Sequence, residues 1–147
     1  MKSITASITF ILTSAIIFTA CKKDDAKQKE NIESEVTNGT WRISYFNDSG
    51  INETANFNSY NFTFNADGTL TAANGSNTYS GTWSVTDSNS NDDSSDDLDF
   101  NINFNLTNDF EDLNDDWDII SHTSSELLLK DVSGGNGGTD ELTFVKN

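Results

Sequence analysis

Residues 60–70 read Tyr60-Asn61-Phe62-Thr63-Phe64-Asn65-Ala66-Asp67-Gly68-Thr69-Leu70, which combines a strand, a tight turn and the start of a second strand. Aromatic residues alternate with polar ones up to Phe64, and this period of two is typical of a half-buried β-strand. The turn follows at once, and Gly68 suits the positive φ that tight hairpin turns require. The segment therefore predicts an antiparallel hairpin with one face in a core.

The same alternation extends over most of the chain and is clearest at 98–106, where large apolar residues alternate with Asp and Asn. Asn74-Gly75 marks a further turn. We expect strands at 41–45, 60–64, 69–72, 79–85, 98–106, 117–121, 127–130 and 141–145. Eight short strands in a chain without proline are typical of a closed antiparallel sheet. The predicted fold class is all-β, an eight-stranded antiparallel up-and-down barrel over residues 39–147.

Residues 1–20 have the composition of an export signal. Met1 and Lys2 precede an uncharged apolar run, which is shorter than the roughly 20 residues of a membrane-spanning helix. The end of this run, Phe18-Thr19-Ala20-Cys21, resembles the lipobox of bacterial lipoproteins, with Phe18 in place of the usual Leu. The resemblance implies cleavage before Cys21 and attachment of acyl chains such as palmitate to it. The alternative is secretion after cleavage behind Ala15.

Residues 21–38 are expected to form a lipidated start and a charged, flexible tether. Ile32 and Val36 are its larger apolar residues, so little can be buried, and a helix is expected only near 29–36. Lys22-Lys23-Asp24-Asp25 resembles the Lys-then-acidic signals by which some Gram-negative bacteria send lipoproteins to the outer face of the outer membrane. We therefore expect an outer-membrane, cell-surface location, with the membrane contacted through the lipid. The alternative interpretation of these four charged residues is a solvated linker.

The body resembles the lipocalin-like domains of bacterial lipoproteins. The resemblance rests on Gly39-Thr40-Trp41, on residues 60–70, on Ser80-Gly81-Thr82-Trp83 and on Leu142-Thr143-Phe144. It implies a barrel that holds a small apolar molecule and transfers no catalytic residue. The candidate ligand-binding residues in the barrel interior are Trp41, Tyr45, Tyr60, Phe62, Tyr79, Trp83, Phe100 and Phe104. The alternative is that these aromatic side chains fill the interior as a core.

The chain is strongly acidic, with a net charge of −16. From Thr40 onward it has three cations, Arg42, Lys130 and Lys146, against 19 acids, so phosphate is repelled and nucleic acid is not expected as a partner. The loop after the fourth strand offers calcium ligands at Asp92, Asp93, Asp96 and Asp97, but its spacing matches no calcium motif and a solvated loop is the simpler interpretation. A second acidic stretch, 109–118, predicts a short amphipathic turn around Phe110 and Leu113 with its acids facing water, and calcium binding is again the alternative.

No residue set indicates an enzyme. His122 is the single histidine, and Cys21, the single cysteine, belongs to the anchor, so neither a zinc site nor a Ser-His pair is expected, and no cofactor is predicted. Two hypotheses follow. The first is a lipid-anchored barrel that binds a small apolar molecule. The second is a packed barrel scaffold whose acidic loops meet a surface protein, a glycan or calcium. The sequence leaves the oligomeric state open.

Overall fold

The computed structural model describes residues 21–87, 98–132 and 138–147, with the backbone alone for residues 21–25. One helix, α1 (Cys21–Val36), precedes nine strands, and no helix of the described segments is long and apolar enough to cross a membrane. The strands are β1 (Trp41–Asp48), β2 (Ile51–Asn52), β3 (Asn61–Phe64), β4 (Thr69–Ala73), β5 (Thr78–Asp87), β6 (Leu98–Asn103), β7 (Asp115–His122), β8 (Glu126–Val132) and β9 (Thr139–Lys146). Two 3-10 helices, η1 (Thr54–Phe57) and η2 (Glu111–Leu113), lie in the connections.

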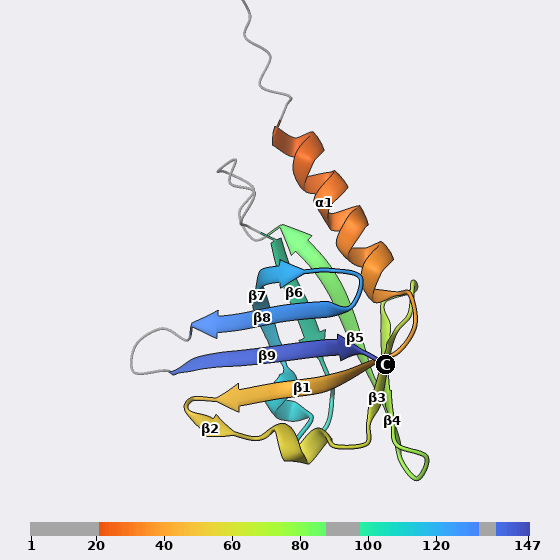
Figure 1. The fold of residues 1–147 in the computed structure, drawn as a ribbon, viewed down its shortest axis with the longest axis vertical. Helices are drawn as coiled ribbons and strands as arrows, with labels where there is room; N and C mark the ends of the chain where they lie inside the picture. The colour runs from red at the N-terminus through yellow and green to blue at the C-terminus, as the bar shows by residue number, and fades with distance from the viewer. Residues whose placement is uncertain (1–20, 88–97, 133–137) are drawn as a thin grey trace, which may run out of the picture.

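Eight of the strands close into a barrel (Figure 1). Neighbours follow chain order from β3 to β9, and β1 closes the ring by pairing with both β3 and β9. Strand β2 has only two residues and pairs with the end of β1. All eight strands that the sequence predicts are present and paired antiparallel. The predicted up-and-down barrel is therefore confirmed.

The hairpin of residues 60–70 forms as the alternation predicts. Phe64 pairs with Leu70 across β3 and β4, and Gly68 has a φ of 85°. The Gly68 N–H donates to the Asn65 carbonyl at 3.0 Å, which closes the turn. Glycine is needed here because an L side chain is strained at this φ.

Strand β6 is shorter than the sequence predicts, since it ends at Asn103. The Asn114 side chain takes the place of a strand partner, because its amide bonds both the N–H and the carbonyl of Phe104. Opposite this point, a Cβ on Gly81 would lie 2.5 Å from the Asn103 carbonyl oxygen and 2.8 Å from the Phe104 ring. The absence of a side chain at Gly81 thus lets β5 approach this end of β6.

The inward faces of the strands form one core that consists largely of aromatic rings. Phe110, just before η2, has its ring centroid 4.8 to 6.1 Å from five other rings, those of Phe57, Tyr60, Phe62, Tyr79 and Phe104. Leu113 is fully buried beside it, whereas Glu111 and Asp112 are exposed. The predicted amphipathic turn is therefore confirmed at Phe110 and η2, whose apolar side packs into one end of the barrel, whereas residues 115–118 of the same acidic stretch belong to β7.

Helix α1 packs on the barrel through its last turns. Ile32 and Val36 are 0% and 1% exposed, and the Trp41 Nε1–H donates to the Val36 carbonyl at 2.8 Å. The sequence predicts too little apolar surface in this segment to bury, but two apolar side chains one helical turn apart suffice to dock a helix end. The segment is therefore a helix of 16 residues, roughly 24 Å long at 1.5 Å per residue, where the sequence predicts a flexible tether.

Candidate functional site

The predicted interior residues are placed mainly as core. Trp41, Phe62, Phe100 and Phe104 are at most 1% exposed. Trp83, Tyr60 and Tyr79 are buried or partly buried against the same cluster. Their rings contact one another, as between Trp83 and Phe100 at 5.6 Å and between Tyr60 and Tyr79 at 5.9 Å. This arrangement favours the core role that the sequence left open beside ligand binding.

The predicted inward position of Tyr45 is wrong, because its side chain does not point into the barrel. The alternation of Trp41, Ile43 and Tyr45 predicts three inward side chains, yet Tyr45 is 38% exposed and Phe46 takes the inward position at 1%. The register of β1 against β9 shifts between Ile43 and Tyr45, as in a β-bulge. One extra residue moves every later side chain to the opposite face.

Strand β7 has a second register shift at the same level of the barrel. It lies between Ile119 and Ser121, in the pairing with β8. Thr143 pairs with Tyr45 on one side and with Leu128 on the other, and Leu128 pairs with Ser121. The two irregularities therefore flank one cross-strand row. Such bulges re-aim side chains and are frequent beside functional sites.

A groove of about 340 Å³ lies along this row on the outer wall of the barrel. It is lined by Tyr45, Ile120, Leu128, Leu129, Lys130, Glu141 and Thr143, and we refer to it as the outer-wall groove. Ile120 is 57% exposed and Leu128 is half-buried, so the groove offers apolar surface to solvent. Sequence alternation alone missed it, because the position of Tyr45 depends on the bulge.

A cluster of carboxylates lies at the β8–β9 end of the barrel. One oxygen each from Asp115, Asp131 and Asp140 lies within 4.8 Å of the others, and all three residues are half-buried. The Ser49 N–H and hydroxyl, in the β1–β2 turn, donate to Asp140 Oδ1 at 2.6 and 3.2 Å. Carboxylate oxygens suit calcium, which takes 6–8 oxygen ligands, and this trio could supply three of them. The metal candidates from the sequence, Asp92, Asp93, Asp96 and Asp97, lie outside the described residues.

Several carboxyl groups at this end hold protons more tightly than usual. Burial raises the pKa of Asp115 to about 6, against the lowering effect of the hydrogen bond from the Asp116 N–H and with added contributions from the Asp116 side chain and from repulsion by Asp131. Burial also raises the pKa of Glu53 and that of Asp112, with nearby carboxylates adding to both effects. Glu53 Oε2 is buried and has no hydrogen-bond partner among the described residues. Folding thus disfavours the charged forms of these carboxyl groups.

Replacing Asp115 with Asn should stabilise the protein at pH 7. The raised pKa means that Asp115 favours the folded state when protonated, and this contribution is lost as the pH rises from about 4 through about 6. Asp115→Asn removes the loss, so its gain in the free energy of unfolding should be larger at pH 7 than at pH 4 in urea titrations. Asp118→Asn, an exposed change on the same strand, is the control for loss of one charge. An equal gain from both variants at pH 7 would contradict the assignment.

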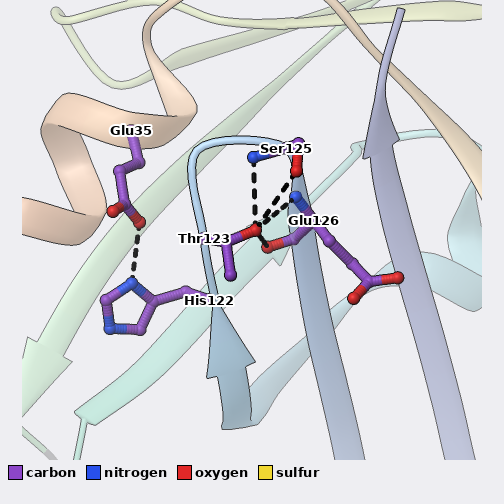
Figure 2. Close-up of polar contacts among 5 residues, drawn as sticks. All are labelled: Glu35, His122, Thr123, Ser125 and Glu126. Carbon is purple, nitrogen blue, oxygen red and sulfur yellow. Dashed lines mark hydrogen bonds and ion pairs between the residues drawn. The ribbon is translucent and has the colours of Figure 1, made fainter.

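His122, the last residue of β7, joins the barrel to α1. Its Nδ1 lies 2.7 Å from Glu35 Oε2 (Figure 2). Thr123 shapes the following turn, because its Oγ1 accepts the Ser125 and Glu126 N–H groups at 3.2 and 3.0 Å. Ser125 Oγ lies 3.5 Å from Thr123 Oγ1, while the imidazole points to the helix. The contact therefore fixes the helix end on the barrel.

Closed barrel, packed interior and outer-wall groove define the structural class of this protein: an up-and-down antiparallel β-barrel with an N-terminal helix. No family model matches the chain, and no curated protein is significantly similar to it. A solved structure of a DUF4847 family protein from Bacteroides vulgatus ATCC 8482 is similar at 22% sequence identity, with a TM-score of 0.50. The similarity covers 79% of this chain and 97% of that one. It supports the fold, in agreement with a lipocalin-like barrel.

Proposed function

We propose that this protein is a lipoprotein held in the outer membrane by acyl chains on Cys21, with its barrel displayed at the cell surface to bind a small apolar molecule. The lipobox-like Phe18-Thr19-Ala20-Cys21 and the charged residues after it support the anchor and the address. Helix α1 begins at Cys21 and docks on the barrel at its other end. The part of α1 before the docked turns, residues 21–31, is long enough to space the barrel from the bilayer by up to about 16 Å.

The binding site in this proposal is the outer-wall groove rather than the barrel interior. The observation that carries it is the aligned pair of register shifts in β1 and β7, which flank the groove and turn Tyr45 outward. The inward aromatic side chains already contact one another. A volume of about 340 Å³ is within the range of small-molecule sites, roughly 300–1,000 Å³.

Ile120→Ser should weaken the binding of a neutral apolar probe about tenfold. Fully covering an isoleucine side chain contributes about 1.5–3 kcal/mol, and Ile120 is 57% exposed in the free protein, so roughly 1.4 kcal/mol of binding free energy is at stake. The measurement is a fluorescence titration with Nile red. Val132→Ser is the matched control, because Val132 is also 57% exposed and does not line the groove.

Two results would count against this site. Equal weakening by Ile120→Ser and Val132→Ser would mean that the probe adheres to any exposed apolar side chain. Failure of the wild type to bind the probe would remove the ligand-carrying function. The packed scaffold that acts through acidic loops would then be the better hypothesis.

A further inference from the structure

A row of charged residues lies beside the apolar part of the outer-wall groove. Lys130 pairs in register with Asp118 on β7 and with Glu141 on β9, and both Lys130 and Glu141 line the groove. We infer that the groove takes a cationic amphiphile, a small molecule with an apolar body and one ammonium group. This inference rests on the proposed function and names the ligand class of the same site.

The local charge of the row is negative. Two carboxylates flank a single ammonium, and within the described segments no carboxylate oxygen forms an ion pair with the Lys130 Nζ. Side chains of directly paired residues on neighbouring strands lie about 5 Å apart, less than the screening length of about 8 Å at physiological salt. A ligand ammonium at Glu141 therefore meets a net negative field.

The rest of the body strengthens this preference. Of the three cations from Thr40 onward, Arg42 and Lys146 lie together at one end of the β1–β9 pair, where Trp41 pairs with Lys146. Glu141 lies toward the other end of this pair. The net charge of −16 attracts a cation and repels an anion before contact. The exposed face of Tyr45 offers a further contact for an ammonium group.

The same charge disfavours a second copy of the chain as the occupant. Two molecules with a charge of −16 each repel one another. A small molecule also matches the size of the groove, about 340 Å³. We therefore assign the groove to one small cation with an apolar body.

The test compares three probes with the same decyl chain: decyltrimethylammonium, decyl maltoside and decyl sulfate. Each is titrated as a monomer into the full body of the protein by isothermal calorimetry. We expect the ammonium probe to bind roughly fivefold or more tighter than the sulfate, with the maltoside between them. Raising the salt concentration should reduce the difference in affinity between the ammonium probe and the sulfate probe.

Two charge variants locate the effect. Glu141→Gln should weaken the binding of the ammonium probe roughly two- to fivefold and leave the affinity for decyl maltoside unchanged. Glu126→Gln, an exposed glutamate on β8 outside the groove, is the matched control and should change neither. Both positions are exposed, so an unchanged melting temperature confirms that each variant folds.

The outcomes separate the inference from the proposed function. If all three probes bind equally and depend on Ile120, the cation preference falls and the apolar site stands. Tighter binding of the sulfate would overturn the inference and make Lys130 the selecting charge. If no probe depends on Ile120, the groove is not the site and both ideas fall.

Discussion

Phe110→Ala should lower the free energy of unfolding by about 3–5 kcal/mol, the range for removal of a buried aromatic side chain. Phe110 is 3% exposed and contacts five other rings at one end of the barrel. Small domains have only about 5–15 kcal/mol in total, so this variant would lose a large part of its stability. Urea titration followed by tryptophan fluorescence measures the loss.

Phe110→Leu is the matched control, since it keeps most of the apolar volume and should cost about 1.5 kcal/mol or less. Because an apolar cavity can bind a small apolar molecule, benzene should raise the melting temperature of Phe110→Ala and leave that of the wild type nearly unchanged. A loss below about 1 kcal/mol for Phe110→Ala would show that the ring cluster is not the core of this barrel end.

Cys21→Ser should release the protein completely from the membrane fraction. The proposed anchor consists of acyl chains, each buried methylene contributes about 0.8 kcal/mol, and a hydroxyl in place of the thiol cannot be lipidated in the same way. Cell fractionation with immunodetection measures the partition, and mass spectrometry of the N-terminal peptide identifies the attached lipid. The change leaves the barrel unaltered, so the released protein should fold normally.

Thr19→Ser is the control, because it keeps a small residue before Cys21 and should leave the protein in the membrane fraction. The competing interpretation, secretion after cleavage behind Ala15, makes a different prediction. In that case the wild type itself would be soluble and Cys21→Ser would have no effect. A variant that stays in the membrane although mass spectrometry shows residues 1–20 removed would rule out the lipid as the anchor.

The strands and their order could be predicted from the sequence because each depends on local information. Alternation such as that around Phe100 and Phe104 identifies a strand with one buried face, and Gly68 marks a tight turn by its φ. With short connections between consecutive strands, antiparallel neighbours follow. The amphipathic turn at η2 was predictable for the same reason, from Leu113 between acids.

The candidate site was not predictable in this way, because it depends on pairing between distant strands. The outward position of Tyr45 requires an extra residue in β1, and alternation assumes that there is none. The approach of Asp115, Asp131 and Asp140 follows from the register of β7, β8 and β9. Docking of α1 likewise depends on Ile32, which packs on a surface that distant parts of the chain build together.

The barrel interior is packed as core, and we propose that the outer wall carries the binding site. The most direct test is an isotope-filtered nuclear Overhauser experiment between the labelled protein and the decyl chain of decyl maltoside. We predict contacts from the decyl chain to Tyr45 and to the methyl groups of Ile120 and Leu128, which line the outer-wall groove. Contacts to the inward rings of Phe62, Phe100 and Phe144 would contradict the claim and return the ligand to the barrel interior.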